Sequence, residues 1–200
     1  MVELVTVIGI IGILVGLLVP ALGRAKREAQ AIQCLSNARQ FALAWTMYAY
    51  DHDDYLPPNE GSSIGAPPSD SWVNGILNPA TDDWPDNTNT LYLSQSLLAP
   101  YLGTSLGVWR CPSDKSMARA GGTLFPRTRT YSMSRSADDF ISSPPPVEKL
   151  RGVRHPSRRF VFLDEREDSI DDCMFLVDMG GGPAGMVTVP GNYHNGSANL

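Results

Sequence analysis

The chain has 200 residues and a net charge of −5, from 16 basic and 21 acidic side chains. The acidic excess lies after residue 50, because residues 24–50 carry four bases against one acid. An acidic globular part argues against nucleic acid as a partner.

The first element is an apolar run over residues 4–22, in which Thr6 carries the only polar side chain. As a helix, this run would be roughly 28 Å long, close to the ~30 Å hydrocarbon thickness of a bilayer. A signal peptide would begin with basic residues, and a core helix would be amphipathic; this run begins after Glu3 and is apolar on every face. We therefore predict a retained single-pass membrane helix, with those two classes as the alternatives.

The same helix is expected to continue through residues 24–50, which contain neither Gly nor Pro. Apolar residues at spacings of three and four predict a stripe that packs on a globular domain. Pro20 lies in the first half and is expected to kink or locally melt the helix. The stripe consists of Ile32, Leu35, Ala38, Ala42, Trp45 and Ala49, broadened by Phe41 and Tyr48.

Residues 51–58 should end the helix, because acids accumulate there before two prolines. His52 lies between carboxylates, which leaves a metal site open beside the simpler interpretation of a solvated turn. Next comes a long connection over residues 59–89, a candidate assembly surface with Trp72 and Trp84 as apolar anchors.

The remaining residues are rich in Gly and Pro, which is typical of a loop-rich domain with short strands. The predicted fold class is α+β, with one long N-terminal helix packed on a small antiparallel sheet. The expected domains are a membrane half (1–23), an amphipathic half (24–50) and a globular head (51–200). Within the head we predict a helix over 91–103, strands over 108–114 (running into a turn), 129–134 and 159–164, and a turn or linker over 142–146.

The densest charge cluster is residues 164–172, with six carboxylates in nine positions. Hard oxygen ligands suit Ca²⁺, although the spacing is not that of an EF-hand and a solvated turn with Arg166 as counterion explains the same residues. No catalytic residue is expected, since the segment has neither a nucleophile nor a phosphate-binding loop nearby. The candidate Ca²⁺ ligands are Asp164, Asp168, Asp171 and Asp172.

Cys34, Cys111 and Cys173 are too far apart in sequence for the usual zinc spacings, so a metal–thiolate site is not expected. A disulfide between Cys34 and Cys111 and three separate thiols both stay open. His155 and His194 are expected to be structural or surface residues.

The first fourteen residues resemble the prepilin-type N-terminal segment of type IV pilins and type II secretion pseudopilins. The resemblance implies that Glu3 neutralises the N-terminal amine of a neighbouring subunit, and Pro20 falls where such pilins carry a proline. Gly12 and Gly16 form a small-xxx-small pair that would permit close helix approach.

The rest of the chain is similar to a pseudopilin-like group of Planctomycetes and Verrucomicrobia. The matching motifs are a Cys-Leu-Ser-Asn segment at Cys34, a Tyr-to-Leu-Pro segment over 50–57 and a Cys-Pro-Ser-Asp turn at Cys111. His194 would begin a C-terminal His-x9-Asp-Gly signature. The basic leader and the final Asp-Gly lie outside this sequence, so we expect a chain truncated at both ends, with prepilin peptidase as a partner if a leader exists upstream.

The predicted function is self-assembly through the N-terminal helix, with other copies, other pseudopilins and the secretion assembly platform as partners. Arg24, Lys26 and Arg27 alone would place their flank of the span in the cytoplasm. The resemblance instead implies a bacterial inner-membrane protein with its head in the periplasm or outside the cell. The alternative is a non-polymerising single-pass protein whose head binds a glycan or Ca²⁺ through Trp72, Trp84 and the acidic loop.

Overall fold

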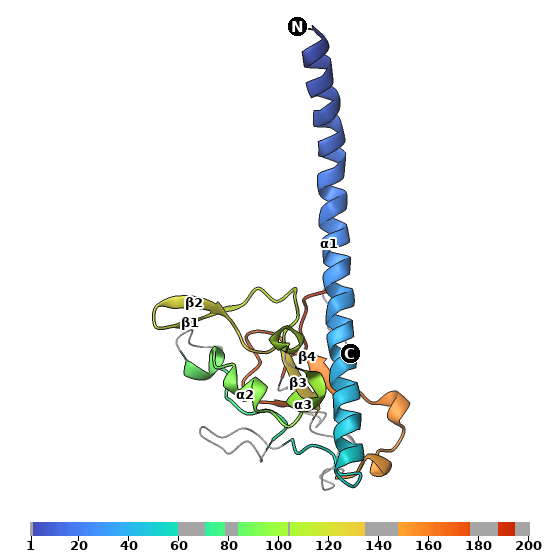
Figure 1. Ribbon diagram of the computed structural model, residues 1–200, viewed down its shortest axis with the longest axis vertical. Helices are drawn as coiled ribbons and strands as arrows, with labels where there is room; N and C mark the ends of the chain where they lie inside the picture. Colours follow the sequence, from blue (N-terminus) through green and yellow to red (C-terminus); the bar gives the residue numbers. More distant parts are fainter. Residues whose placement is uncertain are drawn as a thin grey trace, which may run out of the picture.

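The computed structural model describes residues 2–59, 71–78, 84–103, 105–134, 148–176 and 188–194. One helix, α1 (Val2–Asp51), projects far beyond a small head and then runs along it (Figure 1). The long N-terminal helix and the small sheets confirm the mixed α+β layout. The predicted turn over 142–146 and parts of the long connection lie outside the described residues.

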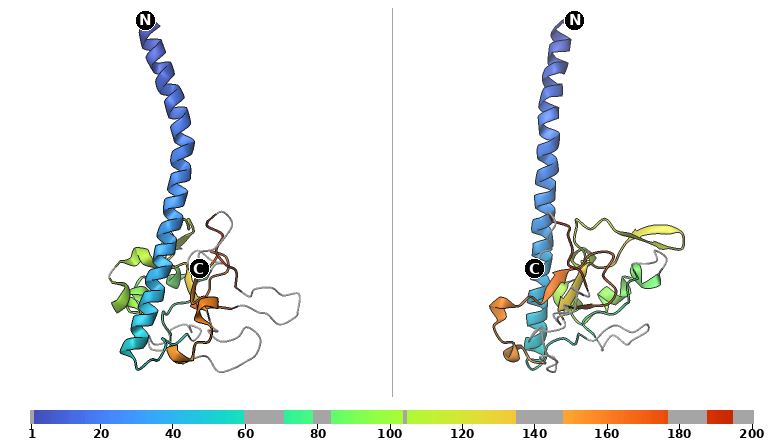
Figure 2. Two further views of the ribbon diagram at one scale, coloured as in Figure 1. Left: turned by 90° about the vertical axis from the view of Figure 1, so that its right-hand side faces the viewer. Right: turned by 180° about the vertical axis from the view of Figure 1, so that it is seen from behind.

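Helix α1 runs through Pro20 without interruption and is gently curved (Figure 2). The predicted local melting at Pro20 is therefore wrong. A proline removes one backbone hydrogen bond, and the helical turns on both sides of it preserve the remainder of the ladder. The helix ends at Asp51, where Asp53 and Asp54 adopt positive φ values of 52° and 72° and the Asp54 N–H bonds to the Ala49 carbonyl.

Two short α-helices, α2 (Leu91–Ser94) and α3 (Ala99–Leu102), stand where a single helix over 91–103 was predicted. Pro100 explains the break, because it has no N–H to bond to the Ser96 carbonyl. Short 3₁₀ helices connect the elements: η2 (Pro85–Asn87), η3 (Leu106–Trp109), η4 (Leu150–Gly152) and η5 (Pro156–Arg158).

The strand predicted from residue 108 is also wrong. Val108 and Trp109 belong to η3, where both side chains are buried in the core. An apolar pair satisfies a strand pattern and a buried 3₁₀ turn equally well, so only tertiary contacts decide between them.

Within the described residues, the head has two small sheets. Strands β1 (Met117–Ala120) and β2 (Thr123–Pro126) form a hairpin around Gly121-Gly122. In the second sheet, β3 (Tyr131–Ser134) pairs antiparallel with β4 (Phe162–Asp164) and parallel with β5 (Met174–Phe175). Strands lie within the predicted ranges 129–134 and 159–164 but are shorter, over residues 131–134 and 162–164, and the sheet is mixed instead of purely antiparallel.

The buried face of α1 differs from the predicted stripe. Ile32 and Leu35 are 69% and 51% exposed, and Ala42 is exposed as well. The buried face instead combines small residues with three aromatic side chains. The buried residues are Cys34, Asn37, Ala38, Phe41, Ala44, Trp45, Tyr48 and Ala49.

The core is centred on the fully buried ring of Phe41. It meets Trp72 and Trp109 edge-on, with ring centroids 5.9 and 5.0 Å away, and lies tilted 5.1 Å from Tyr131 and 5.2 Å from Phe162. Edge-to-face pairs at these distances add about 0.5–1.5 kcal/mol each beyond area burial. This aromatic cluster fastens the second half of α1 to the head.

Gly75 occupies a position that no larger residue fits. Its φ is +94°, and an added Cβ would lie 2.7 Å from the Tyr92 ring. Gly75→Ala is therefore expected to destabilise the head by about 1–3 kcal/mol in urea unfolding followed by tryptophan fluorescence. The control is Gly107→Ala, whose Cβ would make an ordinary 3.6 Å contact with Ser105. Equal unfolding midpoints for the two variants would show that alanine at position 75 causes no strain.

Candidate functional site

The projecting half of α1 is the first functional feature. Its large apolar side chains between Val2 and Leu22 are 50–80% exposed. In the described part of the chain, this helix is long and apolar enough to cross a membrane. Thr6 donates its hydroxyl to the Val2 carbonyl at 2.9 Å, so the one polar side chain of the run is satisfied within the helix.

The predicted assembly residues Glu3, Gly12, Gly16 and Pro20 all lie on this projecting half. A Cβ added at Gly12 or Gly16 would meet no described atom within 4 Å, and the same holds at Gly9. The fold of a single chain therefore does not require glycine at these positions. Glu3 lies in the first helical turn, where a carboxylate also interacts favourably with the helix dipole.

The four predicted calcium ligands do not converge. Asp168 pairs with Arg166, while the carboxylates of Asp171 and Asp172 accept backbone N–H groups one or two residues further along. Asp164 is completely buried at the end of β4 and belongs to a different cluster. The acidic segment thus forms a hydrogen-bonded turn, and its carboxylates are not gathered for one ion.

That other cluster joins Cys34, Cys111, Asp164 and His194, whose donor atoms all lie within 4.8 Å of one another. The Cys34 Sγ is 3.9 Å from the Asp164 Oδ2, and the Cys111 Sγ is 3.2 Å from the His194 Nε2. The first three residues are fully buried and His194 is 8% exposed. The four come from α1, the turn after η3, the end of β4 and the segment 188–194.

This convergence removes the reason for expecting no metal–thiolate site, because that expectation rested on sequence spacing alone. All three cysteines of the chain are thiols in the structure, so the Cys34–Cys111 disulfide stays a prediction although its partners are neighbours. Cys173 lies elsewhere, with its sulfur 2.9 Å from the Ser71 hydroxyl. His155 is exposed, as expected of a surface histidine.

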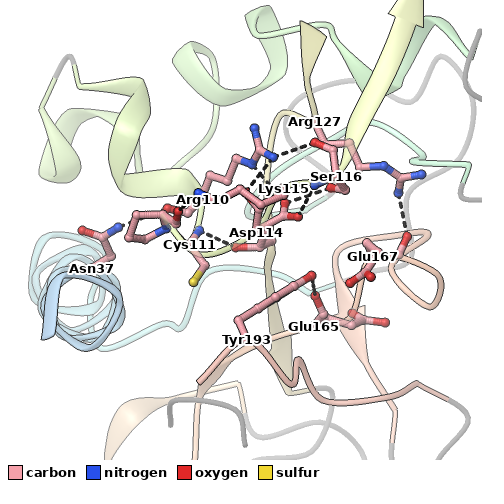
Figure 3. Close-up of polar contacts among 12 residues, drawn as sticks. Asn37, Arg110, Cys111, Asp114, Lys115, Ser116, Arg127, Glu165, Glu167 and Tyr193 are labelled. Atoms are coloured by element: carbon pink, nitrogen blue, oxygen red, sulfur yellow. Dashed lines mark hydrogen bonds and ion pairs between the residues drawn. The ribbon is translucent and has the colours of Figure 1, made fainter. Parts of the chain in front are cut away.

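Cys34 is positioned by the helix and by Tyr131. The Tyr131 hydroxyl lies 3.0 Å from both the Cys34 sulfur and the Cys34 carbonyl oxygen. One turn further, the Asn37 side chain donates to the carbonyls of Gly107 and Arg110 at 3.4 and 3.3 Å. These bonds fix α1 against the loop that carries the second cysteine (Figure 3).

Cys111 begins a turn in which the Asp114 N–H bonds to the Cys111 carbonyl at 3.0 Å. The Asp114 carboxylate accepts from the Arg110 guanidinium at 3.0 Å and from the Ser116 N–H at 2.7 Å (Figure 3). The Cys111 N–H donates to the Thr130 hydroxyl at 2.8 Å. The Cys-Pro-Ser-Asp motif therefore forms a turn that is hydrogen-bonded through the backbone of Cys111 at its start and through the carboxylate of Asp114 at its end.

The segment 188–194 returns to the end of β4 and brings His194 to the cluster. The Gly191 N–H donates to the Asp164 carbonyl at 2.7 Å, and the Tyr193 hydroxyl donates to the Glu165 carbonyl at 3.1 Å. A Cβ on Gly191 would lie 2.8 Å from the Tyr193 ring, so glycine allows this close approach.

Three of the four cluster residues, Cys34, Cys111 and Asp164, become anions when they ionise. The pKa of the Cys111 thiol is raised, first by its hydrogen bond with Cys34 and then by burial. The charges of Cys34 and Asp164 raise this pKa further, whereas the hydrogen bond from the Ser113 backbone lowers it. Burial raises the pKa of Tyr131 as well. Beside the cluster, burial raises the pKa of Glu165 to about 7 against the hydrogen bonds from two serines. The donor set of two thiols, one carboxyl group and one imidazole is of the kind that can hold a metal ion.

The head offers little support for the predicted binding surface. Trp72 is fully buried in the core, which is a correction to its expected role as an exposed ligand platform. A groove of about 710 Å³ lies between α1 and residues 157–162, and another of about 510 Å³ lies between α2 and η3. Their linings, taken from the described residues, contain no Cys, His, Asp or Glu.

No protein-family model matches the chain, and no curated protein or solved structure matches it.

Proposed function

We propose that the chain is a membrane-anchored structural subunit that self-assembles through α1 into a filament of the type II secretion pseudopilus or type IV pilus kind. The observation that carries the proposal is the division of one helix into two halves. The second half lies against the head, whereas the first half is exposed and, apart from Glu3 and Thr6, apolar.

An exposed apolar half of this size must be covered in the cell. About 20 residues at ~1.5 Å per residue span a bilayer, so lipid covers it before assembly. In a filament, the same surface packs against the corresponding halves of neighbouring copies. A single helix can serve both purposes because both environments are apolar and both leave its backbone bonded within the helix.

The glycines of the projecting half favour helix association. Glycine costs about 1 kcal/mol relative to alanine inside a helix, and the head gains nothing from it at Gly9, Gly12 or Gly16. Between helices in an apolar environment, small residues let backbones approach closely. Contact with neighbouring copies is therefore a reason for three glycines in one apolar helix.

In this proposal the protein is a single-pass protein of the bacterial inner membrane with its head on the outer side. Its partners are other copies, related pseudopilins and the membrane assembly platform, with prepilin peptidase acting on any upstream leader. It has no catalytic role. The orientation follows from the resemblance at the N-terminus, since Arg24, Lys26 and Arg27 alone favour the opposite one.

Glu3→Ala is expected to impair assembly and to leave membrane insertion unchanged. Glu3 would neutralise the N-terminal amine of a neighbour, and loss of a charge pair worth about 1.4 kcal/mol lowers association about tenfold. Chemical crosslinking of intact cells measures oligomers, and alkaline carbonate extraction of the membranes measures insertion.

The matched control is Glu28→Ala, which removes an exposed carboxylate from the same helix beyond the apolar half. Its crosslinked oligomers should match those of the unaltered chain. Normal oligomers in the Glu3 variant would remove the proposed role of Glu3, and a chain that is monomeric in every variant would favour the non-polymerising ligand-binding alternative.

A further inference from the structure

We propose that Cys34, Cys111, Asp164 and His194 bind one Zn²⁺ ion that fastens α1 to the head. The four donor atoms come from separate parts of the chain and lie within 4.8 Å of one another. This site is independent of filament assembly, because it concerns the packed half of α1 and not the projecting half.

Two of the six donor–donor separations are close to those around a tetrahedral ion. Zinc bonds of about 2.0–2.3 Å set neighbouring donor atoms about 3.3–3.8 Å apart. The observed separations, 3.2 Å from Cys111 to His194 and 3.9 Å from Cys34 to Asp164, lie on either side of that range. Side-chain shifts of a few tenths of an ångström close these two edges around the ion.

The chemistry of the four ligand side chains favours Zn²⁺ over Ca²⁺ and Mg²⁺. Two thiolates with an imidazole and a carboxylate form a set for Zn²⁺, whereas Ca²⁺ and Mg²⁺ take oxygen ligands. Four protein ligands fill a tetrahedral ion, and three of them are fully buried. A closed, buried site of this kind is structural, since a catalytic zinc keeps one position for water or substrate.

Binding also changes the charge of the cluster. The ion displaces the two thiol protons to solvent, and its two positive charges balance the two thiolates, which leaves the Asp164 carboxylate as the third anion. The neighbouring bonds already hold the ligands in place: Tyr131 beside Cys34, Thr130 on the backbone of Cys111, and Gly191 on the carbonyl of Asp164. Such supporting contacts orient ligands and strengthen metal binding.

The ion would join four segments that lie far apart in the sequence. Cys34 belongs to α1, Cys111 follows η3, Asp164 ends β4, and His194 lies near the end of the described chain. A head of short strands and loops has few regular elements, and a metal that links four segments supplies the order that a larger sheet would otherwise provide.

The test is the metal content of the full untagged chain, purified in detergent without chelator and measured by inductively coupled plasma mass spectrometry. We expect about one zinc ion per chain, and thiolate-to-cobalt charge-transfer absorption after exchange with Co²⁺. Cys111→Ser and His194→Gln should each reduce the zinc content to the level of a buffer blank. Cys173→Ser is the matched control, because it removes a fully buried cysteine outside the cluster and should retain the zinc.

A second measurement does not depend on the folding of the variants. In the unaltered chain, a chelator should increase the alkylation of Cys34 and Cys111 by iodoacetamide, and added Zn²⁺ should reverse the increase. Zinc-free protein with three titratable thiols would overturn the proposal, as would a Cys34–Cys111 disulfide in zinc-free protein. Zinc retained by both cluster variants would overturn it too.

Discussion

Replacing Ile11 and Leu14 with arginine is expected to abolish membrane insertion while the head stays folded. Both side chains are 54% exposed in the middle of the projecting half. Arginine at the centre of a span costs about 2.5–3.5 kcal/mol on insertion scales, so the pair costs about 5–7 kcal/mol. Alkaline carbonate extraction should move the variant to the soluble fraction, and tryptophan fluorescence should report an unchanged head.

The control places the same two changes further along the same helix. Ile32 and Leu35 are 69% and 51% exposed but lie beyond the apolar run, so Ile32→Arg with Leu35→Arg should leave the chain in the membrane. If the two double variants fractionate alike, the apolar run is not the span.

Local patterns were enough to predict the long helix. Its first half is apolar on every face, its second half contains neither Gly nor Pro, and its end carries acids followed by prolines. Each of these signals acts within a few residues, which is the range over which helix propensity and termination operate. The helix over Val2–Asp51 accordingly matches the predicted extent almost completely.

The side of the helix that packs could be predicted only in part. Ala38, Trp45 and Ala49 are buried as expected, whereas Leu35 is half exposed and Cys34 takes its place. The choice between neighbouring faces depends on the shape of the head, where rings from distant segments approach the helix. The spacing of apolar residues along the helix carries no information about the shape of the head.

The cluster of Cys34, Cys111, Asp164 and His194 could be predicted even less well from the sequence. Zinc motifs are recognised from ligand pairs a few residues apart, and no two of the four cluster residues are close in sequence. Only the fold brings them together, through the Cys111 turn, the end of β4 and the segment that carries His194. The available signals were the Cys-Pro-Ser-Asp motif and the histidine signature of the family resemblance, and neither identifies its partners.

Phe41→Ala is expected to lower the free energy of unfolding of the head by about 3–5 kcal/mol, the usual cost of deleting a fully buried phenylalanine. The ring is 0% exposed and lies within 5.9 Å, centroid to centroid, of four other aromatic rings. Those rings belong to the segment around Trp72, to η3, to β3 and to β4, so deleting the Phe41 ring removes contacts with four separate parts of the head. Urea unfolding in detergent, followed by tryptophan fluorescence, measures the loss.

Leu43→Ala is the matched control, since Leu43 is 55% exposed two residues further along the same helix and should change the unfolding free energy by less than about 0.5–1 kcal/mol. A Phe41 variant with the same unfolding midpoint as the Leu43 variant would mean that α1 and the head are not joined through the aromatic cluster. A large loss for Phe41 alone would instead identify this aromatic cluster as the contact that joins the projecting apolar helix to the head.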